Sequence, residues 1–156
     1  MNVKQFALLV VLILPWVGAG EACAASDLRL APDLSYTDDS SSNFPIAGNS
    51  IGDATVASDR ATIMFFGTAH CWNTNREAER LVALYTKYRD KVDFVIVDVN
   101  HPSPGQQPLI AKYYRGFIPT IAVIDRKGEV LYNRAGETAA TRGDTSKLEA
   151  LLNSAK

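Results

Sequence analysis

The chain has 156 residues, of which 47% are hydrophobic and 21% are charged, and its formal net charge is −1 at pH 7. This length accommodates one ordinary domain plus a tail, and the apolar content is sufficient for a hydrophobic core. The near-neutral charge excludes a basic nucleic-acid-binding protein and a highly charged disordered chain. Two cysteines, Cys23 and Cys71, are too few for a disulfide-stapled miniprotein or a cysteine-rich zinc module.

Residues 1–24 have the layout of a secretory signal peptide. A positive charge at Lys4 precedes an unbroken apolar run over 6–14, and small residues follow. We expect cleavage after Ala24 or Ala25. This interpretation predicts a periplasmic or secreted protein that has no membrane span after cleavage.

Two alternatives remain for this first segment. A single membrane anchor is one, but the apolar run is shorter than the roughly 20 residues that a membrane helix needs, and Pro15 interrupts it. A lipoprotein with Cys23 as its lipidated N-terminus is the other, although Gly20 stands where an aliphatic residue is expected. If cleavage falls after Cys23, the mature chain retains Cys71 alone, which rules out an internal disulfide.

Residues 25–50 are polar and rich in Ser, Asp and Pro. They contain little that could form a hydrophobic core, so we predict a flexible polar leader here. The folded domain is then expected over 51–156.

From residue 61 onward the hydrophobic pattern becomes regular. An unbroken apolar run predicts a strand buried on both faces, and apolar residues at helical spacing after it predict a long amphipathic helix. A valine-rich strand, a proline-containing loop, a short helix, a β-hairpin and a last helix follow. In chain order, the predicted elements are the strand 61–66, the helix 73–89, the strand 92–99, the loop 100–107, the helix 108–114, the strand 120–124, the turn 125–128, the strand 129–132 and a helix that begins at Asp144 or Thr145.

This β-α-β-α-β-β-α order predicts an α/β fold. The first strand, helix and strand imply a parallel pair joined by a right-handed crossover, and the closing hairpin implies an antiparallel edge. We therefore expect a mixed central sheet flanked by helices. The residues expected to face the core from the two long helices are Ala78, Leu81, Val82, Tyr85, Tyr88, Leu148, Leu151 and Leu152.

Two motifs within this order resemble the thioredoxin family. Residues 65–71, FFGTAHC, are similar to the strand-to-helix turn that carries the family's first catalytic cysteine. Residues 116–120, GFIPT, resemble the cis-proline loop of the family, and the strand and hairpin after it also match in spacing. The resemblance covers roughly 61–152 and implies a thioredoxin-like fold. Upstream of it, Phe44–Ile46 is the candidate for the family's first strand, and Ile51–Ser58 for a degenerate helix.

The chain departs from the family pattern at the site itself. The family pattern is Trp-Cys-x-x-Cys, whereas this chain has His70-Cys71-Trp72-Asn73-Thr74, so that Thr74 replaces the second cysteine. Phe65 stands where thioredoxins proper keep a buried aspartate that helps to deprotonate that second cysteine. An alternative register, shifted by one residue, places His70 at the cysteine position and leaves no thiol chemistry.

Cys71 is predicted to lie at the N-terminus of the long helix, where unpaired N–H groups and the helix dipole favour a thiolate. Protonated His70 beside it adds to this effect. A thiolate attacks a disulfide and forms a mixed disulfide. Thr74 cannot release the substrate, although its hydroxyl can donate a hydrogen bond to the thiolate. The alternative is a small buried cysteine that packs as a hydrophobe.

The family resemblance implies a cis peptide bond between Ile118 and Pro119, with the backbone before the proline pairing with an extended substrate. The alternative is an ordinary trans turn proline.

Trp72 either contacts an apolar substrate or packs on a neighbouring loop. His70, Cys71 and His101 are the types of residue that bind a soft metal, but their spacing matches no strong motif. We therefore expect no metal and no other cofactor.

The sequence supports two functional hypotheses. The first is an exported monothiol that exchanges with protein or small-molecule disulfides and needs an external thiol reductant. The second is a non-catalytic thioredoxin-fold binding module that holds a protein partner. A dithiol enzyme with normal turnover requires Cys23 to be retained. We expect a monomer, or a dimer linked by a disulfide through Cys71, and no nucleic-acid partner.

Overall fold

A computed structural model describes residues 27–48, 51, 56, 59–136 and 144–155 of the chain. The predicted signal peptide, including Cys23, lies outside these residues. From residue 61 onward the element order is the predicted β-α-β-α-β-β-α. The elements are β1 (Arg29–Leu30), β2 (Ile46–Ala47), β3 (Ala61–Gly67), α1 (Trp72–Tyr88), β4 (Val92–Asp98), α2 (Gln107–Tyr113), β5 (Thr120–Ile124), β6 (Val130–Ala135) and α3 (Ser146–Ser154).

The central sheet has four strands in the order β4-β3-β5-β6. β3 runs parallel to β4 and antiparallel to β5, and β5 and β6 form the antiparallel hairpin. The predicted mixed sheet is therefore confirmed. Because β3 and β4 are parallel, both end at the same edge of the sheet. The pairing of Phe66 with Thr120 places the start of β5 at that edge as well.

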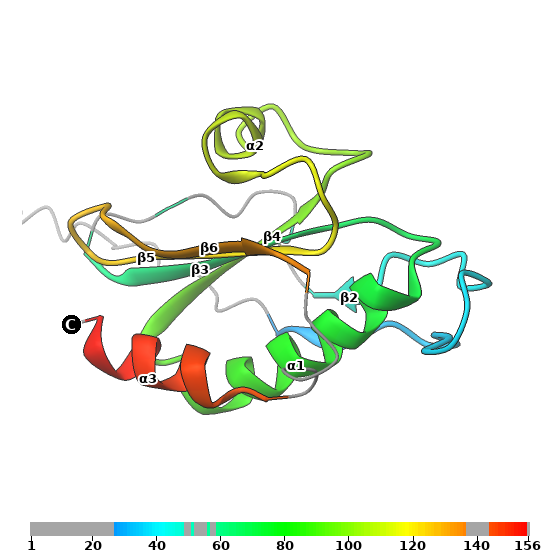
Figure 1. Ribbon diagram of the computed structural model, residues 1–156, viewed down its shortest axis with the longest axis horizontal. Coiled ribbons are helices and arrows are strands. Elements are labelled where there is room, and N and C mark those ends of the chain that lie inside the picture. The colour runs from blue at the N-terminus through cyan, green and yellow to red at the C-terminus, as the bar shows by residue number, and fades with distance from the viewer. Residues whose placement is uncertain (1–26, 49–50, 52–55, 57–58, 137–143, 156) are drawn as a thin grey trace, which may run out of the picture.

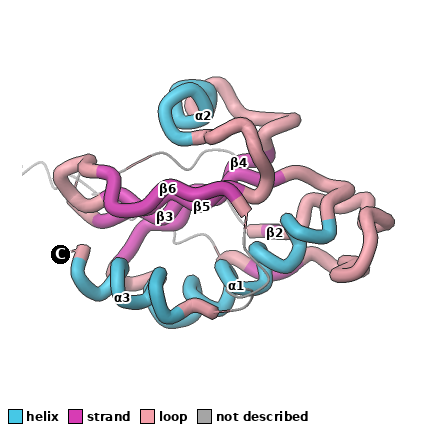
Figure 2. Tube along the Cα trace, in the orientation of Figure 1, coloured by secondary structure: helices cyan, strands magenta, loops and turns pink. Residues whose placement is uncertain are grey.

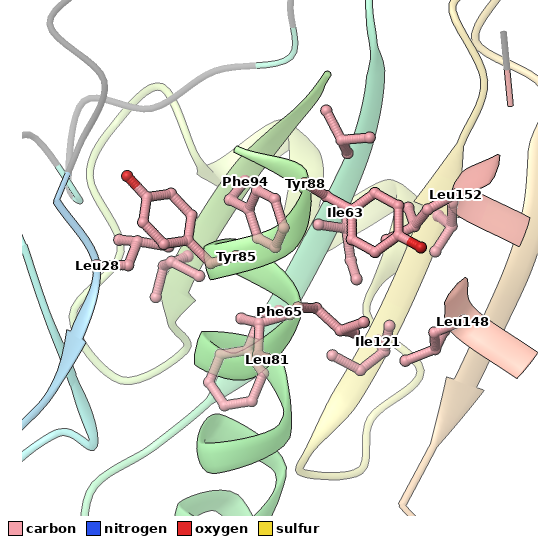
Figure 3. Close-up of a cluster of buried hydrophobic side chains, with 14 of the residues drawn as sticks. Leu28, Ile63, Phe65, Leu81, Tyr85, Tyr88, Phe94, Ile121, Leu148 and Leu152 are labelled. Atoms are coloured by element: carbon pink, nitrogen blue, oxygen red, sulfur yellow. The ribbon is translucent and has the colours of Figure 1, made fainter. Parts of the chain in front are cut away.

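Helices cover both faces of the sheet, as Figures 1 and 2 show: α1 and α3 lie on one face and α2 on the other. Successive residues of a strand point to opposite faces, so fully buried β3 contributes to two cores. Ile63 and Phe65 pack with α1 and α3 (Figure 3), whereas Met64 and Phe66 pack on the side of α2. Burying one such side chain contributes about 1.5–3 kcal/mol. None of the helices in the described part of the chain has the length and apolar character that a membrane span requires.

The segment 27–48 corrects our expectation of a flexible polar leader over 25–50. β1 and β2 pair antiparallel in a small separate sheet, and Leu28 and Ile46 are buried in the core that α1 covers. The folded unit therefore begins before residue 51. Leu28 and Ile46 anchor this segment in the core, and hydrogen bonds between its polar groups and α1 hold the rest of the segment in place.

The candidate for the family's first strand is also corrected. Phe44 precedes β2 rather than belonging to it, and β2 pairs with β1, not with the central sheet. The proposed helix Ile51–Ser58 falls mostly outside the described residues.

Two details of the predicted elements differ from the structure. In α1, Leu84 is buried whereas Val82 is only half-buried. The contact between the helix and the sheet decides which residues of the helix face the core. β6 extends to Ala135, three residues beyond the predicted end. Its polar residues Asn133 and Arg134 break the apolar pattern, but the backbone ladder with β5 does not depend on side-chain polarity.

Asp93 on β4 provides a test of the electrostatics of the fold. Burial raises the pKa of Asp93, although Arg60, 3.3 Å away, lowers it, and Asp59 adds a smaller rise. A carboxyl with a raised folded-state pKa stabilises the fold below its unfolded pKa, and this contribution is lost as the pH rises through the folded value. We expect Asp93→Asn to stabilise the protein at pH 7 by less than about 1 kcal/mol, because partial exposure screens the charge.

Urea denaturation at pH 4 and pH 7 measures this effect. The variant should also show a smaller change in the free energy of unfolding between the two pH values. If Asp93→Asn instead destabilises the protein at pH 7, the ion pair with Arg60 outweighs the cost of burial.

Candidate functional site

The predicted site residues gather around the sheet edge where β3 and β4 end and β5 begins. Residues 68–71 lead from β3 into α1, which begins at Trp72, one residue earlier than predicted, so that Cys71 lies at the N-terminus of the helix as expected. Its backbone is extended, with a φ angle of −147°, and its side chain is half-buried. The thiol is free and makes no capping hydrogen bond to the helix. The structure therefore places a single, partly accessible sulfur at the N-terminus of a 17-residue helix.

Hydrogen bonds on both sides hold the turn between β3 and α1. The Val99 N–H donates to the Gly67 carbonyl at 2.9 Å, and Nδ2 of Asn100 donates to Oγ1 of Thr68 at 2.6 Å. His70 has a φ of +54°, a left-handed conformation that few non-glycine residues adopt, and its side chain is exposed. His70 and Cys71 are thus consecutive in a fixed turn.

Thr74, which replaces the second cysteine, is fully buried. Its methyl group packs against Gly67, since a Cβ built on Gly67 would lie 2.5 Å from Cγ2 of Thr74. The hydroxyl Oγ1 is buried without a hydrogen-bond partner. The predicted hydrogen bond from Thr74 to Cys71 is therefore not formed, which corrects that expectation. Leaving a buried hydroxyl unpaired costs about 1–3 kcal/mol.

The proline loop lies at the same edge of the sheet. The peptide bond between Ile118 and Pro119 is cis, the geometry that the resemblance implied. Pro119 is buried and its carbonyl accepts from the Gly136 N–H at 2.6 Å, whereas Ile118 is half-buried and Phe117 is 71% exposed. No hydrogen bond links the backbone of Ile118 to another described residue.

A loop over residues 35–41, here termed the capping loop, covers the start of α1. Oδ1 of Asp39 accepts from the Trp72 N–H at 2.9 Å, and the Ser41 carbonyl accepts from the His70 N–H at 3.1 Å. Asn75 is fully buried, and its Nδ2 donates to the Ser35 carbonyl at 2.6 Å and to Oγ of Ser41 at 2.9 Å. The loop thus supplies, through Asp39, an acceptor for a backbone N–H of the first turn of α1, and it also bonds the turn before the helix and the Asn75 side chain.

Sequence reasoning missed these residues. Asp39 and Trp72 lie 33 positions apart, and no local pattern joins them. The only available signal was the abundance of Ser, Asp and Asn, the residue types that cap helix N-termini. Such residues usually cap the helix that follows them directly, whereas here the cap comes from a distant segment.

Trp72 packs beneath another side chain of α1. The guanidinium of Arg76 lies 4.6 Å from the centroid of the Trp72 ring, and Nε of Arg76 donates to the Tyr36 carbonyl at 2.8 Å. The ring thus packs on Arg76 of its own helix, while the backbone of Trp72 bonds to the capping loop. The tryptophan nevertheless stays half-exposed.

The structure does not bring His101 into a metal site with His70 and Cys71. The His101 side chain is 83% exposed, and its Nδ1 lies 3.0 Å from Oδ2 of Asp98. No group of three or more His, Cys, Asp or Glu residues within the described ranges is arranged to hold a metal ion.

The comparisons with known proteins are limited to folds. No family model matches the chain, and neither does any curated protein. Similar solved structures include the germline-specific thioredoxin Deadhead of Drosophila melanogaster, with 21% identity over 62% of this chain and 81% of that chain, at a TM-score of 0.47. Thioredoxin from Fasciola hepatica has 22% identity over 63% and 83%, at a TM-score of 0.48. Thioredoxin O2 from Arabidopsis thaliana has 20% identity over 69% and 86%, also at 0.48.

The chain has a thioredoxin-like fold. This follows from its own strand order, from the helices on both faces of the mixed sheet, and from the cis proline at the start of β5. Among the described residues the central sheet contains four strands, and the additional pair formed by β1 and β2 lies apart from it.

Proposed function

We propose that this protein carries out thiol–disulfide exchange through one working cysteine, Cys71. The observation that carries the proposal is a free, half-buried sulfur directly before α1, at the same sheet edge as cis-Pro119. The dipole at a helix N-terminus attracts negative charge, and the attacking group in thiol–disulfide exchange is an anionic sulfur.

The reaction proceeds in two exchanges. The Cys71 thiolate attacks one sulfur of a substrate disulfide, a new S–S bond forms, and the old S–S bond breaks. The leaving sulfur takes the electron pair and then a proton from water, so the substrate half is reduced while Cys71 is oxidised. Thr74 has no sulfur with which to resolve this mixed disulfide. An external thiol therefore attacks it and regenerates Cys71, which makes the site a monothiol.

The proline loop is proposed to align the substrate. The Ile118 backbone makes no hydrogen bond to another described residue, so it can pair with an extended segment that carries the target disulfide. Protein disulfides and small-molecule disulfides both fit this mode. The signal-peptide pattern at 1–24 supports an exported protein, in the periplasm or outside the cell. The proposed state is a monomer, or a dimer joined through Cys71.

The proposal is tested by comparing Cys71→Ser with Thr74→Val. Cys71→Ser should abolish exchange with a small disulfide. Thr74→Val should preserve it, because the Thr74 hydroxyl makes no hydrogen bond. Alkylation of the wild-type thiol, followed against pH, should be faster near neutral pH than alkylation of an unfolded cysteine peptide. Alkylation no faster than that of the peptide would contradict the proposal.

A binding module without thiol chemistry is the second candidate. The exposed ring of Phe117, 71% accessible beside the cis proline, favours it because an exposed aromatic side chain is a common contact at protein interfaces. In that case a protein partner should bind Cys71→Ser as tightly as the wild type. Exchange activity that depends on Cys71 distinguishes the first candidate from this one.

A further inference from the structure

We propose that Asp39 is a specificity-determining residue for exchange at Cys71. Its carboxylate makes the site favour disulfides that carry positive charge beside the S–S bond over those that carry negative charge. This inference rests on the proposed function and names the class of substrate that the same site accepts best.

The position of Asp39 is set by a contact with the helix that begins after Cys71. Oδ1 of Asp39 accepts from the N–H of Trp72, the residue next to Cys71, at 2.9 Å. The capping loop is anchored on either side of this contact by the bonds of Ser41 to His70 and of Ser35 to Asn75. A carboxylate is therefore held on the backbone N–H of the residue that follows Cys71.

Asp39 carries its charge at the surface, outside any ion pair with the described residues. Asp39 is exposed, and it forms no ion pair with another described residue. Arg76, a cation in the second turn of α1, donates to the Tyr36 carbonyl and lies over the Trp72 ring, and it forms no ion pair with Asp39. Asp38 adds a second carboxylate to the capping loop. Hydrogen bonds from Ser40 and then Ser35 lower the pKa of Asp38, which keeps it ionised at neutral pH.

These charges act on the substrate as it approaches the sulfur. A cationic group beside the S–S bond is attracted by the Asp39 carboxylate, whereas an anionic group is repelled. At the separation of neighbouring residues and in contact with water, one such charge changes a rate by about threefold, and added salt reduces the effect. The preference is the ratio of the rate constants for a cationic and an anionic disulfide on the same protein. The ionised fraction of Cys71 enters both rate constants equally and cancels from their ratio.

The test uses three small disulfides of different charge: cystamine, which is cationic, 2-hydroxyethyl disulfide, which is neutral, and dithiodipropionate, which is anionic. Second-order rate constants for exchange at pH 7 are measured for the full-length mature chain. The wild type should react in the order cationic, neutral, anionic. Asp39→Asn should reduce the cationic-to-anionic ratio by about threefold or more, because the amide oxygen keeps the hydrogen bond to Trp72 while the charge is lost.

Asp90→Asn is the matched control. Asp90 is exposed and lies just beyond the far end of α1, about 25 Å along the helix from Cys71. The substitution changes the net charge by the same amount and should leave the ratio unaltered. In wild type, 0.5 M salt should compress the ratio towards that of Asp39→Asn.

The outcomes separate this inference from the function on which it rests. If the wild type exchanges with all three disulfides and Asp39→Asn leaves the ratio unchanged, the inference is overturned and the proposed function stands. An equal fall in Asp90→Asn overturns it too, because net charge alone then explains the preference. If the wild type reacts with none of the three disulfides, the proposed function is wrong, and the inference that rests on it is wrong as well.

Discussion

Replacing Gly67 with valine is expected to destabilise the protein by about 3 kcal/mol, a large part of the total stability of a domain of this size. A Cβ at this position would lie 2.5 Å from Cγ2 of Thr74 and 2.7 Å from Cε1 of Phe65. Both neighbours are fully buried, so neither can move aside without disturbing the core or the first turn of α1. Denaturant unfolding measures the loss of stability, and alkylation of Cys71 reports the change at the site.

Gly128→Ala is the control for Gly67→Val. Gly128 has a φ of +81°, and a Cβ there meets no atom within 4 Å. Its substitution should cost only about 1 kcal/mol, from the left-handed backbone, and should leave the reactivity of Cys71 unchanged. A Gly67→Val variant that is as stable as the wild type would show that the packing between β3 and α1 is looser than the structure indicates.

Asn75→Ala is expected to release the capping loop from α1 and to destabilise the protein by about 2 kcal/mol. The amide of Asn75 is fully buried and bonds both the Ser35 carbonyl and Oγ of Ser41. Its removal takes the donor away from the Ser35 carbonyl and opens a cavity in the first turns of the helix, whereas Oγ of Ser41 keeps its bond from the Ser35 N–H at 2.6 Å. Amide hydrogen exchange in residues 35–41 should accelerate well beyond the change in the central sheet.

Asn73→Ala provides the comparison, because Asn73 is exposed on the same helical turn. It should leave both stability and hydrogen exchange of the capping loop close to those of the wild type. If exchange in residues 35–41 is already as fast in the wild type as in an unstructured peptide, the loop is not held by Asn75 in solution.

Short-range patterns predicted much of the candidate site. The position of Cys71 directly before α1 depends on where an apolar strand ends and an amphipathic helix begins, and both signals lie within a few residues of it. The cis bond before Pro119 is what the resemblance of residues 116–120 to the proline loop of the thioredoxin family implied. Each of these features is encoded within a segment shorter than 15 residues or so, which is the range in which periodicity is informative.

The role of Thr74 was predicted only in part. Its identity excludes a resolving cysteine, and that conclusion requires nothing beyond the sequence. Whether its hydroxyl bonds to Cys71 depends on the side-chain rotamer. Packing of the methyl group against Gly67 is part of what sets that rotamer, and it leaves Oγ1 without a partner.

By itself, then, the sequence determined the α/β class and the order of elements from residue 61, because both follow from hydrophobic period and turn chemistry close along the chain. The candidate sulfur at Cys71 and the proline loop were implied by the resemblance of residues 65–71 and 116–120 to the thioredoxin family. Only the tertiary structure decided that residues 27–48 pack on the domain, that Asp39 caps α1 and that Ser41 bonds the turn before it. Polar contacts between segments more than 30 positions apart leave no periodic signal, since any Ser, Asp or Asn can form them and only the folded backbone selects which one does.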